Sequence, residues 1–159
     1  MTNLLIVTLT VLAALGSGLV AGIFFAFSAF LMTALSRLPP PQGIAAMQSI
    51  NVAVLNPWFF AAFFGTAAAC VILAVLAFFN WNALGGVYPL AGSVVYLLGS
   101  MLVTMAFNIP LNQALAAVEP ASAEGGALWT RYLSAWTAWN HVRTSASLLA
   151  AASFIAALR

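Results

Sequence analysis

LLIVTLTVLAALGSGLVAGIFFAFSAFLMTAL, residues 4–35, contains no charged side chain. A helix rises about 1.5 Å per residue, so this stretch forms a helix of about 48 Å, longer than a bilayer core of about 30 Å. Arg37 and the run Pro39-Pro40-Pro41 end it, because proline interrupts helical hydrogen bonding. We therefore expect a membrane-crossing helix that tilts or projects beyond the lipid.

The composition of the whole chain also indicates a membrane protein. Hydrophobic residues make up 65% of the 159 residues, charged residues only 4%, and there is no lysine. Soluble domains carry about 25% charged residues, so lipid is the solvent that suits this surface. The net charge of +2 comes without a basic cluster. Nucleic-acid binding depends on many phosphate contacts, and we exclude it.

Three more apolar stretches are long enough to cross a bilayer. We place them at residues 56–79, 87–117 and 128–158, with a kink at Pro110 in the second of them. A short helix is expected at residues 42–55 and a turn at residues 80–86. We expect a polar loop to hold Glu119, Glu124 and the pair Gly125-Gly126. The sequence thus predicts one all-α domain, residues 1–159, built as an integral membrane bundle of four transmembrane helices with a short additional helix in the first loop.

Small residues recur at helix-packing intervals in the first two spans. They are Ala14, Gly18, Gly22 and Ala26, and then Ala61, Gly65 and Ala69. Such stripes let helix backbones approach closely. We favour seams inside the bundle, and a homo-oligomer interface is the alternative.

The alternating topology gathers polar side chains at one depth. The first loop, the end of the third span and the start of the fourth span all lie on the same side of the membrane. The side chains brought together there are Gln48, Asn51, Asn56, Asn108, Asn112, Trp136, Asn140, His141 and Arg143. The half of the bundle towards the other side of the membrane is built mainly of Ala, Leu, Val and Phe. We expect a binding site in the polar half.

Arg143 is the most informative of these residues. An arginine at membrane depth costs about 2.5–3.5 kcal/mol on insertion scales, and no aspartate or glutamate lies within any span. Its partners must therefore be neutral acceptors or an anionic ligand. The alternative is that the side chain snorkels towards water.

The other polar residues have structural alternatives. Helical spacing places Trp129, Trp136, Asn140 and Arg143 on one face, with His141 about 100° away on its flank. A lone histidine in such a place is commonly a hydrogen-bonded structural residue. Tryptophans on this helix suit either an interfacial aromatic belt or the wall of an aromatic site.

Several chemistries lack the residues that they need. One histidine, one cysteine and no carboxylate within a span give no obvious metal or bis-histidine haem site in one subunit. Cys70 lies in an apolar run, where it acts as a small hydrophobe. The absence of an intramembrane carboxylate weighs against an ion-coupled transporter.

Three short motifs occur together along this four-span frame. They are Met47-Gln48-Ser49-Ile50-Asn51, Asn108-Ile109-Pro110-Leu111-Asn112 and Trp136-Thr137-Ala138-Trp139-Asn140-His141-Val142-Arg143. In this order the chain resembles the anthrone-oxygenase-like family of small membrane proteins. The resemblance covers nearly the whole length and implies a multi-pass protein of the bacterial inner membrane.

The resemblance implies oxidation of an anthrone-type polyketide by molecular oxygen, without a metal, a flavin or any other cofactor. We expect His141 to accept the acidic ring proton. Arg143, Asn140 and Asn108 are expected to stabilise the enolate. Side chains expected to bind the hydrophobic substrate are Gln48, Asn51, Asn108, Asn112, Trp136 and Trp139. The alternative is a non-catalytic membrane protein that binds a lipid or quinone or assists a partner.

Overall fold

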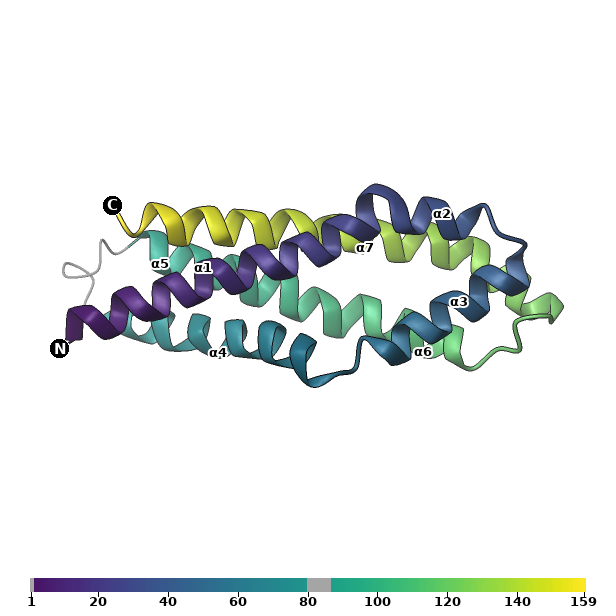
Figure 1. Cartoon of the computed structure of the whole chain (residues 1–159), viewed down its shortest axis with the longest axis horizontal. Helices are drawn as coiled ribbons and strands as arrows, with labels where there is room; N and C mark the ends of the chain where they lie inside the picture. Colours follow the sequence, from purple (N-terminus) through teal and green to yellow (C-terminus); the bar gives the residue numbers. More distant parts are fainter. Residues whose placement is uncertain (1, 80–86) are drawn as a thin grey trace.

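The computed structural model describes residues 2–79 and 87–159, and every regular element among them is helical. The helices form an elongated bundle with both chain ends at the same end (Figure 1). The turn expected at residues 80–86 lies outside the described residues.

The first long helix consists of three continuous segments: α1 (Thr2–Ala26), η1 (Phe27–Leu31) and α2 (Met32–Ser36). η1 is a wider, π-type turn, in which the Met32 N–H donates to the Phe27 carbonyl five residues back. Arg37 caps the end, as predicted. The short helix α3 (Pro40–Ala53) then begins at the proline run, two residues before the predicted start, because proline is compatible with a first helical turn.

The second and third spans also match the predicted ranges closely. α4 (Pro57–Phe79) begins behind Asn56, whose Oδ1 accepts the Phe59 N–H at 3.0 Å. The third long helix runs through α5 (Val87–Val95), η2 (Tyr96–Leu102), η3 (Thr104–Asn108) and α6 (Ile109–Ala116). It continues through Pro110, and the turn before that proline widens: the Ile109 N–H donates to the Thr104 carbonyl.

The last helix begins earlier than predicted. α7 (Ala123–Ala156) takes in Glu124, Gly125 and Gly126, which were expected in a loop. The Ser122 side chain accepts the Gly125 N–H at 3.0 Å, and Glu124 lies in the positive first turn. A Cβ atom at position 125 would meet the Glu119 carbonyl oxygen, so the glycine allows the loop to pack against this turn.

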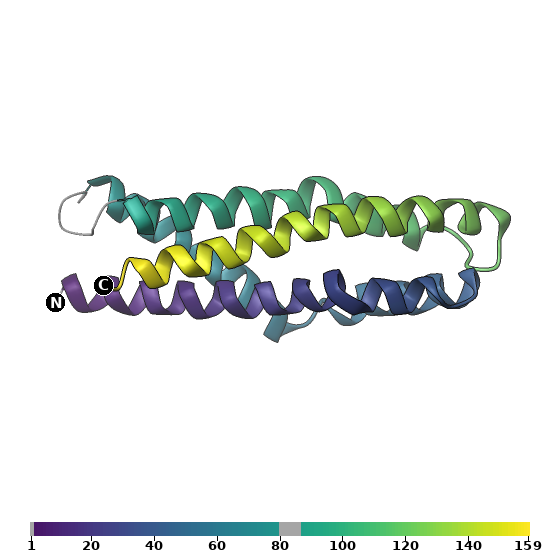
Figure 2. The ribbon, with the colours of Figure 1, turned by 90° about the horizontal axis from the view of Figure 1, so that it is seen from above.

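Within the described residues, 2–79 and 87–159, three helices are long and apolar enough to cross a membrane: Leu4–Ser36, Pro57–Phe79 and Val87–Ala116. The chain is therefore a helical protein with long apolar helices of the kind found in membranes. α7 is less apolar than these three helices because it carries Arg131, Asn140, His141 and Arg143. It nevertheless packs alongside α1 over much of its length (Figures 1 and 2).

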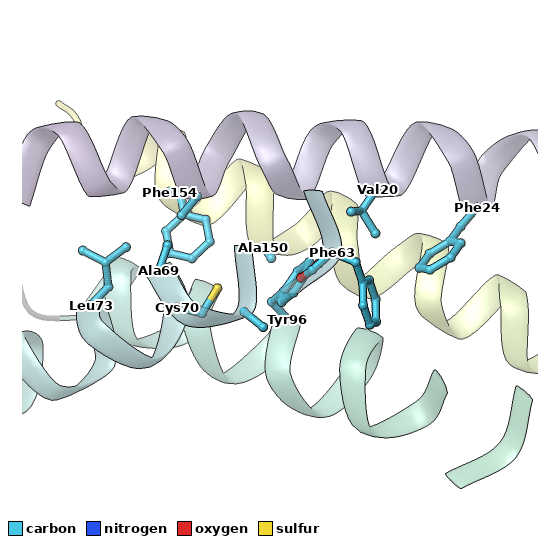
Figure 3. Packing of buried hydrophobic residues seen from close by; sticks show 11 residues of the cluster. Val20, Phe24, Phe63, Ala69, Cys70, Leu73, Tyr96, Ala150 and Phe154 are labelled. Atoms are coloured by element: carbon cyan, nitrogen blue, oxygen red, sulfur yellow. The ribbon is translucent and has the colours of Figure 1, made fainter. Parts of the chain in front are cut away.

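One core cluster lies between α1, α4, the third helix and the second half of α7. Figure 3 shows its members, which include Phe24, Phe63, Tyr96 and Phe154. A second cluster, on the other side of Phe24, contains Met32, Ile44, Met47, Trp129, Tyr132 and Trp136. Phe24 of the first cluster and Trp136 of the second both contact Arg143.

The small-residue stripes form the expected seams only in part. Gly18, Gly22 and Gly65 are exposed, and a Cβ atom at each would meet nothing within 4 Å. The close approaches occur instead at Gly16, against Thr66, and at Gly99, against Ala146. The glycines of the stripes thus face outward, whereas Ala14 and Ala69 pack in the interior.

The outer surface divides the bundle into two halves. In residues 31–49 and 110–139, Leu38 is the one exposed large apolar side chain. The exposed residues there include Arg37, Glu119, Glu124 and Arg131. We call these residues the polar-surfaced half. The remainder of the helices, the apolar-surfaced half, exposes large apolar side chains such as Leu15, Phe64, Leu98 and Leu149.

The interior of the apolar-surfaced half is less apolar than predicted. It buries hydroxyl side chains that include Thr10, Ser17, Thr66, Ser93, Ser100 and Ser147. Several of them, such as Thr10 and Ser93, donate to the carbonyl four residues back in their own helix. Hydroxyl groups satisfied in this way suit an apolar interior.

Candidate active site

The site is built around Arg143, where the two halves of the bundle meet. Arg143 lies near the middle of α7 and is only 4% exposed. Nη2 donates to Asn140 Oδ1 at 2.8 Å, and Nη1 donates to Thr104 Oγ1 at 3.3 Å. These two bonds engage a group that has five N–H donors. The Nε–H is buried and has no hydrogen-bond partner.

Aromatic rings take the place of a counter-charge around this guanidinium. Its central carbon lies 4.1 Å from the centroid of the Phe24 ring and 5.0 Å from that of Trp136. Cation–π contacts of this kind contribute about 2 kcal/mol when they are shielded from water. The only carboxylate side chains of the sequence, Glu119 and Glu124, are exposed in the polar-surfaced half. Arg143 thus brings an uncompensated positive charge into the bundle.

Asn140 fixes the position of Arg143. Its Nδ2 donates to the Phe24 carbonyl at 2.7 Å and to Ser28 Oγ at 2.8 Å, while its Oδ1 accepts from Arg143. Ser28 also pairs with Thr144 at 3.1 Å. Both ends of the amide are therefore occupied, and Asn140 acts as a positioning residue.

Trp136 is held by a second amide. Asn112 Oδ1 accepts from Trp136 Nε1 and from the Tyr132 hydroxyl, both at 2.8 Å. The Tyr132 and Trp136 rings stack with their centroids 6.1 Å apart. Asn112 therefore fixes the indole ring whose face meets Arg143.

Two of the widened turns supply partners of this network. Thr104 begins η3, and Phe27 and Ser28 begin η1. Wide turns of this type occur frequently at functional sites. They place these side chains opposite the 136–143 stretch of α7.

A cavity of about 140 Å³ lies beside Arg143. Its polar lining comes from Asn51, Thr104, Asn112, Trp136 and Arg143. Asn51 Nδ2 is buried and lies next to the Tyr132 hydroxyl. The rest of the lining is apolar: Ile23, Phe24, Phe27, Ile50, Val54, Leu55, Phe59, Phe60, Phe63, Phe64 and Ile109. The cavity therefore offers N–H donors and a positive charge within an aromatic wall.

Five of the predicted site residues lie outside this cavity: Asn140, described above, and Gln48, Asn108, Trp139 and His141. Gln48 donates to the carbonyls of Leu115 and Val118 and so joins α3 to the end of α6. Asn108 is buried and donates to the Trp136 carbonyl at 3.2 Å. These two amides join helices, because carbonyl groups of neighbouring helices are within their reach.

Trp139 and His141 lie on the outer side of α7. Trp139 stacks on Phe107 with centroids 3.7 Å apart. His141 is exposed, and it does not line the cavity. Because Asn140 and Arg143 face inward, the 100° offset of position 141 turns this imidazole away from the guanidinium. His141 is therefore not placed to act as a base for a ligand in this cavity.

The phenylalanines of the cavity wall were not predicted from the sequence. The run Trp58-Phe59-Phe60-Ala61-Ala62-Phe63-Phe64 places two aromatic pairs four residues apart on one side of α4. The Phe59 and Phe63 rings stack at 5.6 Å. This spacing was the available signal for an aromatic wall.

Comparison with known proteins identifies the family. The family model described as anthrone oxygenase matches residues 58–153. The chain belongs to the anthrone oxygenase family. No curated protein and no solved structure matches it.

The part matched by the anthrone oxygenase family model contains α4, the third long helix and most of α7. It therefore includes Arg143 together with Asn140, Trp136 and Thr104. Phe24 and Asn51, which complete the cavity, come from helices before the match. Among residues 2–79 and 87–159, no three His, Cys, Asp or Glu side chains are grouped as metal ligands would be.

Proposed function

We propose that this protein is a membrane-embedded oxygenase that oxidises enolisable, hydrophobic aromatic compounds of the anthrone type with molecular oxygen. The observation that carries the proposal is the buried Arg143, which lines an aromatic cavity and keeps an unpartnered N–H. Family membership supports an oxygenase-like activity. The choice of substrate and the roles of the residues are our inference.

The proposed membrane placement follows the outer surface. α4 has 23 residues, about 35 Å of helix, which matches a bilayer core of about 30 Å. We infer that the second half of α7 crosses beside it as a fourth span. The polar-surfaced half would then project into water. Trp58, which is 86% exposed at the start of α4, would lie at the interface, as tryptophan prefers.

In the proposed chemistry, Arg143 stabilises the oxyanion of the substrate. An anthrone that has lost a ring proton is an enolate, whose negative oxygen can accept N–H groups of Arg143 and Asn51. Fixed donors in a water-poor site stabilise such charge strongly. The side chains that line the cavity include no ordinary base at neutral pH. We therefore propose that the substrate binds as the enolate and that its proton goes to water.

The reaction with oxygen then needs only the substrate and O₂. The carbanion-like carbon forms a C–O bond with O₂, and the terminal peroxide oxygen takes up a proton to give a hydroperoxide. Loss of water breaks the O–O bond and the remaining C–H bond and leaves a carbonyl group. The balance is R₂CH₂ + O₂ → R₂C=O + H₂O.

Oxygen uptake by the purified protein in lipid nanodiscs tests this proposal. With anthrone and ¹⁸O₂, we expect uptake well above that of empty nanodiscs, one O₂ per anthrone, and ¹⁸O in the new carbonyl group. Uptake equal to that of empty nanodiscs contradicts the proposal. Stable binding of a lipid or quinone without uptake would favour the non-catalytic alternative.

A further inference from the structure

The cavity beside Arg143 has a buried inner end and an exposed mouth. The inner end is formed by side chains that are each at most 4% exposed: Phe24, Phe63, Trp136 and Arg143. The mouth is formed by exposed apolar side chains: Leu55 at 64%, Phe64 at 48%, and Phe60 and Ile109 at 40% each. The opening therefore lies between the first two turns of α4 and the start of α6.

The mouth lies on the apolar outer surface of the bundle. Phe60, Phe64 and Ile109 belong to the apolar-surfaced half, and Leu55 lies two residues before α4. In the membrane placement proposed above, the mouth faces lipid close to the interface assigned to Trp58. Hydrophobic molecules concentrate in lipid, so they reach an apolar opening from the bilayer more readily than from water. The charged inner end is therefore reached sideways.

An anthrone is too large to be enclosed at the inner end alone. The cavity volume of about 140 Å³ is close to that of engineered cavities, about 150 Å³, that bind benzene, whereas an anthrone has three fused rings. Part of its ring system has to occupy the mouth. The inner end and the mouth therefore hold such a ligand together.

The oxygen and the reacting carbon of an anthrone lie on opposite sides of its central ring. When the oxygen accepts N–H groups of Arg143 at the inner end, the reacting carbon has to point towards the mouth. O₂ is a small apolar molecule and concentrates in lipid. The carbon that reacts with O₂ would then face the medium that holds most of it.

We propose that the substrate enters this cavity sideways from the lipid with its oxygen leading, and that its reacting carbon stays in the mouth, where O₂ arrives from the same lipid. This inference rests on the proposed function, because it assigns an entrance and an orientation to the substrate of that oxygenase. The exposed mouth residues then select the substrate by its shape. Groups on the reacting carbon are tolerated, and a group on the oxygen is not.

A nitroxide label at the rim tests whether a ligand occupies the mouth. Leu55→Cys carries the label in a Cys70→Ala chain in phosphatidylcholine nanodiscs. The control is Leu149→Cys, at a residue that is 61% exposed and does not line the cavity. The ligand is 10,10-dimethylanthrone, which has no C–H bond at the reacting carbon and cannot be oxidised there.

Saturation with this ligand should lower O₂ collisions at position 55 to about half, because a ligand in a pocket is largely covered by the protein around it. Collisions at position 149 should not change, since the ligand in the lipid itself affects both labels equally. Unchanged collisions at position 55 overturn the proposal.

The same label tests which side of the ligand leads. The compound 9-methoxyanthracene has the same three rings but carries a methyl group on its oxygen. It should shield position 55 only at concentrations at least about tenfold higher than 10,10-dimethylanthrone, the effect of losing one hydrogen bond to a charged group. Equal shielding by the two compounds at equal concentration overturns the orientation.

A wider side chain at the mouth tests the entrance itself. Ile109→Trp should lower kcat/KM for anthrone at least about tenfold, as a poorer fit in a hydrophobic pocket does in other enzymes. Ile155→Trp, at a residue that is 56% exposed and outside the cavity, should keep the wild-type value. A wild-type kcat/KM in Ile109→Trp contradicts entry through this mouth. Shielding of position 55 without oxygen uptake refutes only the oxygenase, whereas oxygen uptake without shielding refutes only the sideways entry.

Discussion

The two halves of the bundle have different outer surfaces and similar interiors. Both bury aromatic and aliphatic side chains, around Phe63 in the apolar-surfaced half and around Trp129 in the polar-surfaced half. Outside, one half exposes large apolar residues and the other exposes charges and small residues. The two halves thus differ in the solvent that their surfaces suit, lipid or water, and Arg143 is buried at the depth where the outer surface changes.

The largest expected effect comes from removing the charge at this depth. Arg143→Leu should lower turnover of an anthrone at least about 100-fold, as the loss of one oxyanion donor does elsewhere. Leucine suits the apolar surroundings, so the variant should remain folded. Oxygen uptake in nanodiscs measures the effect.

Arg131→Leu is the matched control from the polar-surfaced half. Arg131 is exposed, so this variant should retain wild-type turnover. Equal losses in the two variants would show that the difference between the halves has no functional meaning.

A smaller effect is expected at the helix seam of the apolar-surfaced half. A Cβ atom at Gly99 would meet the Cβ atom of Ala146, which cannot rotate away. Gly99→Ala should therefore destabilise the protein by about 1–3 kcal/mol, the usual cost of overpacking. Thermal unfolding in detergent measures it.

Gly18→Ala provides the comparison, because a Cβ atom there meets nothing within 4 Å. This variant should be neutral or slightly more stable, since alanine favours a helix by about 1 kcal/mol over glycine. A lower melting temperature for Gly18→Ala than for Gly99→Ala would contradict the packing described for α1 and the third helix.

The smallest effect is expected at His141. Its imidazole is exposed on the outer side of α7 and does not line the cavity. His141→Ala should therefore keep turnover within about twofold of wild type, because it removes neither a donor nor a wall of the cavity. A loss as large as that of Arg143→Leu would restore the imidazole to the mechanism.

The sequence predicted the helices well because their signals are local. Apolar runs, Asn56 before α4 and the proline run before α3 each act within a few residues. The start of α7 was misjudged because its capping depends on Ser122 and on the approach of the Glu119 carbonyl to Gly125. Without these contacts, a glycine pair is typical of a loop.

The site was predicted in part. Helical spacing correctly placed Trp136, Asn140 and Arg143 on one buried face. It could not distinguish an amide that lines a cavity, such as Asn51, from one that joins helices, such as Gln48, because that depends on which carbonyl groups lie within reach.

We propose that Arg143 lies where the bundle passes from lipid to water. Nitroxide labels at Ser134→Cys, Val142→Cys and Leu149→Cys, in a Cys70→Ala chain, test it through collisions with O₂, which concentrates in lipid, and with a nickel chelate, which stays in water. We expect nickel collisions to dominate at position 134, oxygen collisions at 149, and intermediate values at 142. An oxygen-dominated signal at position 134 would place the polar-surfaced half in the bilayer and contradict the claim.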